Sequence, residues 1–450
     1  MESISVRRAV VSYHQDRLRH QAESVATQSL KNGIWLYFLL LIFEGALRKW
    51  VLPGLSAPLL IIRDPVALWL LYQTWKRGYL PSSFYLYGFV FITCFSILTA
   101  VTLGHGNMFV ALFGARILLL HFPLMFVIGR IFYREDVVKI GKITLWITIP
   151  MTVLLALQFY SPQTAWVNRG VGGDMEGAGF AGAMGFYRPP GTFSFTNGTT
   201  LFYSFAAAFI VYFWLGGKGM NRLVLSIATA CLLMAIPLSI SRGLFFSVAV
   251  TVLFALLSTL NKPEFFGKFL LAGIIMAIAI GGLSFTPYFQ TATEAFFTRF
   301  ESSSKVEGGL EGVLLDRYLG GLIGALGESG KQPFFGYGLG LGTNVGSLLL
   351  TGGVYYLISE GEWGRLVGEM GPLLGIFIIF LRISLCVKMS IASYQKMRAG
   401  DLLPWLLLSF GLLVIPQGQL SQPTALGFCV MIGGLLIASF HTPKRTARRG

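Results

Sequence analysis

The feature that most constrains this chain is a series of apolar segments, each about 20 residues long, that recur from residue 33 to residue 440. A helix of that length crosses the ~30 Å hydrocarbon core of a bilayer. Only 12% of the 450 residues are charged, against about 25% in soluble domains, so a water-soluble globule could not cover its surface. The apolar runs are continuous rather than alternating, which excludes a membrane β-barrel. The sequence therefore predicts an all-α, polytopic membrane protein.

Each apolar segment predicts one membrane-spanning helix, which gives about twelve spans. Their ranges are 33–50, 56–75, 83–103, 108–129, 138–160, 198–216, 223–240, 244–260, 267–286, 364–387, 402–417 and 424–440. Spans one to nine lie within 33–286, with a long connection at 161–197, and spans ten to twelve lie within 363–440. Between them lies 287–362, and a connection this long is usually folded rather than structureless. We therefore expect this loop to form a lid or an active site.

The basic residues set the orientation of the predicted spans. Cytoplasmic connections of membrane proteins are enriched in Lys and Arg, and 22 of the 35 basic residues fall on one face if the N terminus is inside. The polar segment 1–32 and the basic tail 441–450 are therefore both expected in the cytoplasm, with the two long loops outside. The formal charge of +15 follows from this topology, so the expected partner is the lipid bilayer and no nucleic acid.

The cysteines and histidines predict neither a disulfide nor a metal site. All four cysteines lie inside apolar runs without a CxxC pair, which is typical of small core residues. None of the five histidines lies in either long outer loop, and no HExxH motif or zinc-ligand spacing occurs. We therefore expect no metal and no cofactor, and a Ser–His–Asp hydrolase is disfavoured.

Two arginines at the predicted outer boundary are candidate binding residues. Arg242 lies in an SRG turn between two apolar helices, where a charge is costly unless it is paired or hydrated. Arg188 precedes a rigid PPG turn just before the sixth span. Two guanidinium groups on one face suit the oxygens of a pyrophosphate. The alternatives are an interfacial arginine that reaches lipid headgroups and, for Asn197 in the same segment, a helix cap.

Three carboxylates near the start of the tenth span are candidate catalytic residues, namely Glu360, Glu362 and Glu369. In a helix, Glu362, Arg365 and Glu369 share one face. A structural salt bridge with Arg365 is one explanation of this pattern. The other is that one carboxylate accepts the proton of an attacking hydroxyl group.

Charged residues also occur inside the first two predicted spans. Glu44 and Arg48 are four residues apart, and Arg63 and Asp64 lie in the second span. Because a short connection makes these two helices antiparallel neighbours, the four charges can form one compensated cluster. A structural role is favoured for it over a functional one.

Four motifs, in order along the chain, resemble those of a known membrane-enzyme family. They are Arg188-x-x-Gly191-x-Phe193-x-x-x-Asn197, Ser239-x-Ser241-Arg242-Gly243, Arg317 with the later Pro333-Phe334-Phe335-Gly336-Tyr337-Gly338, and Glu369-x-Gly371-x-x-x-Gly375. With the long loop before the tenth span, this set resembles the O-antigen ligase and polysaccharide polymerase superfamily of bacterial inner-membrane glycosyltransferases. The likeness covers roughly residues 185–380, and the first half agrees mainly in its number of spans.

The resemblance implies a transfer reaction at the periplasmic face of the inner membrane. Members move a glycan from undecaprenyl pyrophosphate to an acceptor, and their paired arginines contact the pyrophosphate. These roles carry over to Arg188 and Arg242, with Arg317 or Arg365 assisting. The expected partners are the lipid-linked oligosaccharide donor, a glycan acceptor and other polysaccharide assembly proteins. Because the leaving group is already a pyrophosphate, stabilising its developing charge can supply catalysis without a metal.

One departure from the family separates its two activities. Ligases of the superfamily carry a histidine in the large outer loop, and 287–362 has none. The expected function is therefore a polymerase for exopolysaccharide or O-antigen repeats, with Glu360, Glu362 or Glu369 activating the acceptor hydroxyl. An O-antigen ligase acting on lipid A–core is the first alternative. A twelve-span transporter or lipid-linked oligosaccharide flippase is the second.

Overall fold

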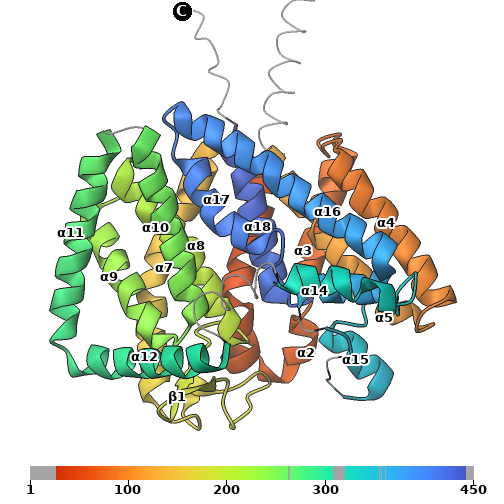
Figure 1. Ribbon diagram of the computed structural model, residues 1–450, viewed down its shortest axis with the longest axis horizontal. Helices are drawn as coiled ribbons and strands as arrows, with labels where there is room; N and C mark the ends of the chain where they lie inside the picture. Colours follow the sequence, from red (N-terminus) through yellow and green to blue (C-terminus); the bar gives the residue numbers. More distant parts are fainter. Residues whose placement is uncertain are drawn as a thin grey trace, which may run out of the picture.

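The computed structural model describes residues 27–261, 264–307, 320–353, 355, 357–359 and 361–441. Within these ranges the strands are β1 (Phe180–Ala183) and β2 (Phe186–Arg188), which pair in one antiparallel hairpin. All other regular structure in the described ranges is helical (Figure 1). The all-α prediction is therefore confirmed.

Eight helices of the described residues are long and apolar enough to cross a membrane. They are Thr27–Val51 (ending in η1, Leu47–Val51), Pro53–Lys76 (η2, Pro53–Leu55; α2, Ser56–Leu59; α3, Arg63–Lys76), Phe84–Thr102 (α4), Met108–Ile131 (α5, Met108–Arg116; η3, Ile117–His121; α6, Leu124–Ile131), Arg134–Tyr160 (α7), Thr196–Leu215 (α8), Arg242–Thr259 within α10 (Arg242–Asn261), and Glu362–Arg398 (α16). The chain is thus a multi-pass membrane protein.

Four further apolar helices coincide with the remaining predicted segments. Three are shorter: α9 (Arg222–Leu238), α17 (Leu403–Val414) and α18 (Pro423–Ser439). The fourth is α11 (Glu264–Ser284), which passes the same test only together with α12 (Pro287–Glu307), to which it is bent by 103°. The largest difference from the predicted boundaries is in α16, which ends at Arg398 rather than at 387, because its polar last turns continue as a helix.

Hydrogen bonds and ion pairs show which helix ends lie together. Lys31 pairs with Asp136 (2.6 Å), and the Arg134 N–H donates to the His441 carbonyl (3.3 Å). Arg134 also pairs with Asp401, just before α17 (3.0 Å). These contacts gather the first helix, α7, α17 and the end of α18 at one face, which we call the terminal face (top in Figure 1).

The opposite face carries the longest connections, and we call it the loop face. Trp50 donates to the Trp166 carbonyl (3.0 Å), and the His105 N–H donates to the Tyr337 carbonyl (3.1 Å). Its elements are η4 (Trp166–Asn168), the β-hairpin, α12, α14 (Gly321–Gly327), η6 (Ser329–Lys331) and α15 (Asn344–Thr351). In Figure 1, α12 and α14 run across the bundle rather than along it. The described part of 287–362 is therefore folded, as predicted.

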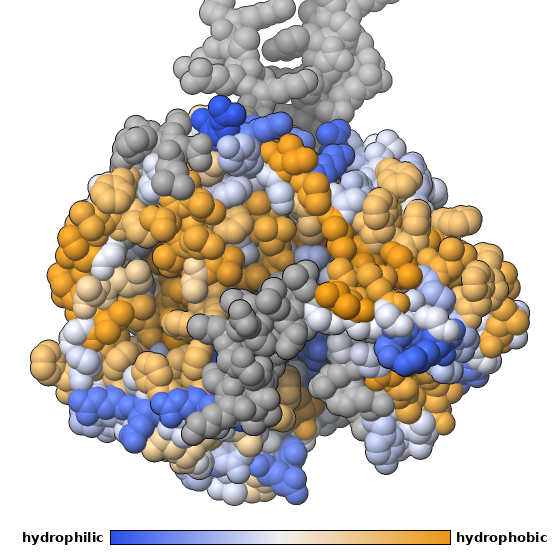
Figure 2. Space-filling view, viewed as in Figure 1, coloured by the Kyte–Doolittle hydropathy of each residue, from blue (hydrophilic) through white to orange (hydrophobic). Residues whose placement is uncertain are grey.

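The surface and the core agree with a membrane-embedded bundle. Figure 2 shows hydrophobic side chains over the belt between the two faces and hydrophilic ones gathered toward them. Inside, 83% of the residues in the most apolar 18-residue stretch of α8 are buried. The helix α18 packs against α6, α8 and α17. The centre of the bundle therefore lies around α8 and α18, and the loop-face end of α8 is where the candidate site is found.

Candidate functional site at the loop face

A tightly held segment, residues 188–197, crosses the loop face and enters α8. We call it the α8 entry segment. The fully buried Lys49 ammonium donates to the carbonyls of Gly191 (2.6 Å) and Phe193 (2.8 Å). The Gln158 side chain accepts from the Gly191 N–H (2.8 Å). Because buried side chains pair these backbone groups, the first helix and α7 fix the conformation of the segment.

The first helix approaches this segment so closely that only glycine fits at position 45. A Cβ on Gly45 would lie 2.5 Å from the carbonyl carbon of Phe193. On the same helix, Arg48 donates to the Ser194 hydroxyl (3.1 Å) and pairs with Glu44 (3.4 Å). The α8 entry segment therefore rests on a helix surface that presents Arg48 and Lys49.

The second candidate arginine, Arg242, begins α10 and is buried. The Ser241 hydroxyl accepts from the Leu244 N–H (3.3 Å) and shares a hydrogen bond with the Thr200 hydroxyl (2.8 Å). Ile240, just before this cap, has a φ of 46°, a conformation that β-branched residues rarely adopt. Strain of this kind persists where the surroundings impose it, and it clusters at functional sites.

Arg188 and Arg242 approach the same end of α8. Arg188 ends β2, and the carbonyl of the next residue, Pro189, accepts from the Thr199 hydroxyl (3.1 Å). The following residue of α8, Thr200, contacts the residue before Arg242. Each arginine therefore lies one residue from a contact with the first two turns of α8.

Asn197 does not cap α8, so that alternative was wrong. The helix begins at Thr196, and Phe195 before it makes no side-chain cap. The Asn197 amide instead donates to the Gln422 side chain at the start of α18 (3.0 Å). Because the helix begins two residues earlier than a cap at 197 requires, this side chain is inside the first turn and faces a neighbouring helix.

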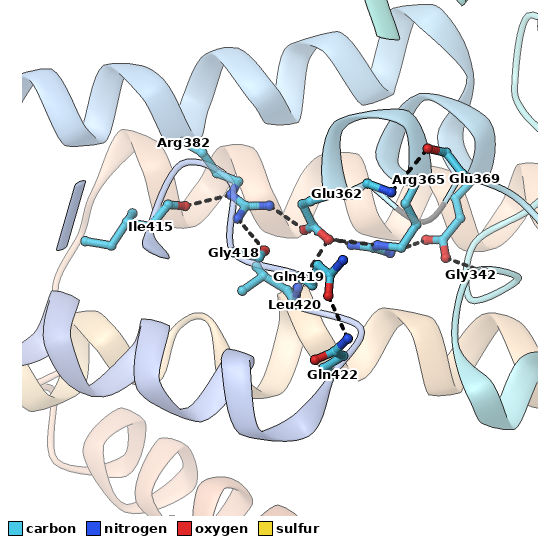
Figure 3. A network of polar contacts seen from close by, with 12 residues as sticks. Gly342, Glu362, Arg365, Glu369, Arg382, Ile415, Gly418, Gln419, Leu420 and Gln422 are labelled. Carbon is cyan, nitrogen blue, oxygen red and sulfur yellow. Dashed lines mark hydrogen bonds and ion pairs between the residues drawn. The ribbon is translucent and has the colours of Figure 1, made fainter. Parts of the chain in front are cut away.

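Four buried charges form a network along α16, which we call the α16 network: Glu362, Arg365, Glu369 and Arg382 (Figure 3). Arg365 donates to both oxygens of Glu362 (3.0 Å each) and to Glu369 (2.7 Å). Arg382 donates to Glu362 (2.5 Å). None of the four residues is more than 4% exposed. The predicted shared helix face is therefore confirmed, and the network also includes Arg382, which the sequence did not indicate.

The α16 network also holds two connections of the loop face. The Leu420 N–H donates to Glu362 (3.2 Å), and the Gly342 N–H donates to Glu369 (2.8 Å). Arg382 donates to two carbonyls in the connection between α17 and α18 (2.9 and 3.1 Å). Charges and hydrogen bonds are thus balanced, as a buried ionic network requires.

This geometry bears on the roles predicted for these side chains. The guanidinium of Arg365 is engaged by Glu362 and Glu369, and both oxygens of each carboxylate face donors. Because the hydrogen-bonding groups of these three side chains are already engaged, a structural role is favoured for them. Binding a pyrophosphate or accepting a proton is correspondingly disfavoured. Arg317 and Glu360 lie outside the described residues, and their roles stay predictions.

The glycine-rich stretch after α14 packs directly onto α16. Gly371 has a φ of 77°, and a Cβ there would lie 2.6 Å from the Gly336 nitrogen. The Tyr337 N–H donates to the Gly368 carbonyl (2.8 Å). Two of the four sequence motifs, P-x-x-G-x-G and E-x-G, are therefore one structural unit in which two backbones touch.

The ion pairs of the first two spans fall into two sets rather than into the single cluster that the sequence allowed. Glu44 pairs with Arg48 (3.4 Å) and Arg63 (3.1 Å), as expected. Asp64 instead pairs with Arg116 (2.6 Å). The reason is that the fourth span packs against α3 and presents a cation that the sequence did not place there.

A cavity of about 900 Å³ lies at the loop face between α8, α14, α16 and the connection before α18. Its walls carry amides, glycines and one indole, among them Asn197, Gly324, Gln332, Trp363, Gln417 and Gln419. Arg188 and Arg242 do not line it. Asn197, however, belongs to the first turns of α8 that both arginine segments approach, so the cavity and the arginines flank one helix end.

Sequence reasoning missed Lys49, Arg382 and Trp363. Arg382 carried a usable signal, because a lone arginine inside an apolar segment is expected to be paired and important. Lys49 follows Arg48 at a helix end and resembles an ordinary interfacial cation. Trp363 carried no signal, since nothing in the sequence places α14 against it.

The described residues contain no group of three or more His, Cys, Asp or Glu side chains that could hold a metal ion. The four cysteines are free thiols. No protein-family model, curated protein or solved structure matches this chain.

Proposed function

We propose that this protein is a polysaccharide polymerase of the bacterial inner membrane. It transfers a glycan from undecaprenyl pyrophosphate to the end of another lipid-linked repeat unit, and the loop face is its periplasmic side. The observation that carries the proposal is the approach of Arg188 and Arg242 to one end of α8, beside a segment held by Arg48 and Lys49.

Positive charge exceeds negative charge beneath the α8 entry segment. Glu44, Arg48, Lys49 and Arg63 form what we call the first-helix group. Among the ion pairs of the described residues, Arg48 and Arg63 contact one carboxylate, Glu44, and Lys49 contacts none. Buried surplus charge of this kind attracts a pyrophosphate, because the low dielectric around it strengthens the interaction. Guanidinium groups near the phosphates then stabilise the charge that develops on the leaving group.

We also infer that all twelve apolar helices cross the membrane, with both termini in the cytoplasm. Eight have the length for it, and the four others coincide with the remaining apolar segments of the sequence. The connections at the terminal face carry the basic residues that cytoplasmic loops favour, among them Lys76, Arg130, Lys218 and Arg398.

Transfer also requires that the acceptor hydroxyl loses a proton. Because Glu362 and Glu369 already face donors on both oxygens, we assign them the positioning of the loop-face connections. Glu360, two residues before α16 in the sequence, is then the proposed general base.

The test is reconstitution of the purified protein with a lipid-pyrophosphate-linked repeat unit. The wild type is expected to give a ladder of products, and Arg188→Ala and Arg242→Ala are expected to abolish it. Arg299→Ala, on α12 at the same face, is the matched control and is expected to keep the ladder. A ladder that survives both substitutions would contradict the assignment of Arg188 and Arg242 to the pyrophosphate. Single transfer to added lipid A–core would identify a ligase, and movement of the lipid without transfer would identify a transporter.

A further inference from the structure

Two buried polar atoms at the loop-face cavity have no protein partner among the described residues. Trp363 is 7% exposed, and its indole N–H meets no acceptor. The side-chain carbonyl oxygen of Gln332 is buried as well and meets no donor. Both residues line the cavity. Since buried polar groups are nearly always paired, one donor and one acceptor at a cavity wall point to a ligand that pairs with both.

The described lining offers a ligand no cation. It contains no lysine or arginine, and each of its two carboxylates is engaged: Glu328 with Lys331 (2.7 Å) and Glu362 within the α16 network. Uncharged hydrogen-bonding groups line the walls instead, including the amides of Asn197, Gln417 and Gln419. An anionic ligand would find no counter-charge here, whereas hydroxyl and acetamido groups match amide and indole partners.

Small residues of α14 leave room for the ligand. A Cβ on Gly321 would lie 3.5 Å from the Trp363 ring, and a Cβ on Gly324 would meet no atom within 4 Å. The volume of about 900 Å³ is typical of small-molecule sites. An indole beside several amides offers an apolar surface for the C–H faces of a sugar ring and partners for its hydroxyls.

We propose that this cavity binds uncharged sugar units of the acceptor glycan. The indole N–H of Trp363 donates to a sugar oxygen, and the Gln332 carbonyl accepts from a hydroxyl or acetamido N–H. Asn197 lines the cavity and lies in the turns of α8 that the two arginine segments approach, so the bound sugar lies beside the donor pyrophosphate. The acceptor role and the nearby donor pyrophosphate rest on the proposed polymerase function, whereas binding of sugar to the cavity does not require transfer.

Calorimetric titration of the full chain in nanodiscs tests this inference. The probes are maltotetraose, cellotetraose, mannotetraose and chitotetraose, with the anionic tetragalacturonate as contrast. We expect at least one neutral tetrasaccharide to bind and tetragalacturonate to bind about tenfold more weakly or not at all. Trp363→Phe removes the donor and Gly324→Val fills open space, and each is expected to weaken binding about tenfold.

Gly327→Val is the matched control for the filled cavity. Gly327 is on the same helix, also meets no atom within 4 Å of a built Cβ, and does not line the cavity. It is expected to keep wild-type affinity, and equal melting temperatures of the two valine variants will show that both fold.

Three results would overturn the inference: no binding of any neutral probe, equal affinity for tetragalacturonate, or unchanged affinity in Gly324→Val. The two proposals fail separately. Sugar binding without any transfer would contradict the proposed polymerase function but would still support the sugar site in the cavity. If transfer occurs and Gly324→Val leaves the KM for the acceptor unchanged, the sugar site in the cavity is contradicted and the polymerase function is still supported.

Discussion

The α16 network and the first-helix group are both buried, but they are built differently. In the α16 network two carboxylates face two arginines, and every carboxylate oxygen has a donor. In the first-helix group two arginines share one carboxylate, Glu44, and the third cation, Lys49, contacts no carboxylate. A balanced group must be broken before it can bind anything, so it holds the fold. A group with surplus cations lowers the cost of bringing an anion close.

Removing a cation from the balanced group is expected to have the largest effect. Arg382→Met leaves Glu362 without one of its two arginines at a position that is 3% exposed. Breaking a buried ion pair in this way costs about 3–5 kcal/mol of stability. The measurement is the unfolding free energy in detergent, with Arg398→Met, exposed at the end of the same helix, as the control expected to change it by less than about 0.5 kcal/mol.

Removing a cation from the first-helix group is expected to cost less. Lys49→Met leaves the Phe193 carbonyl without its donor and the Gly191 carbonyl with only the Gln158 amide (3.3 Å), but it strands no carboxylate, so the loss is about 1–3 kcal/mol. Because the α8 entry segment loses its anchor, affinity for the lipid-linked donor falls as well. If Lys49→Met and Arg382→Met destabilise the protein equally, charge balance does not distinguish the α16 network from the first-helix group.

Glu369→Gln separates a positioning residue from a general base. The amide still accepts from the Gly342 N–H but loses the charge that faces Arg365. We expect a loss of about 1 kcal/mol or more in stability and nearly wild-type kcat for the folded fraction. A fall in kcat of about a hundredfold or more at wild-type stability would instead identify Glu369 as the base.

The smallest effect is expected at the terminal face. Asp401 pairs with Arg134 where both side chains are partly exposed. Asp401→Asn should therefore cost about 1 kcal/mol or less, because partly exposed pairs are weak, and salt should reduce the difference. Polymer length should be unchanged. A large loss of transfer in this variant would show that the loop face does not act alone.

The helices were predictable because apolar length alone dictates them, and all twelve predicted segments contain one. The predicted shared face of Glu362, Arg365 and Glu369 was also confirmed, since helical spacing determines it. Tertiary packing decided the rest. Asp64 pairs with Arg116 because the fourth span packs on α3, a contact that no local pattern encodes.

The walls of the candidate site were the least predictable part. Trp363 and Gly324 are far apart in the sequence, and they line one cavity only because α14 packs against α16. Neither residue stands out in the sequence. Asn197 looked like a cap because its residue type favours caps, but the helix begins at Thr196, two residues earlier than such a cap requires, after a segment held by buried anchors.

The most direct test of the central claim is the affinity of the protein in nanodiscs for undecaprenyl pyrophosphate without any glycan. Comparison of the wild type with Arg188→Ala, Arg242→Ala and the control Arg299→Ala isolates the pyrophosphate from the sugar. We predict that each of the first two substitutions weakens binding about tenfold or more and that the control does not. Equal affinity in all four proteins would contradict the assignment of the pyrophosphate to this end of α8.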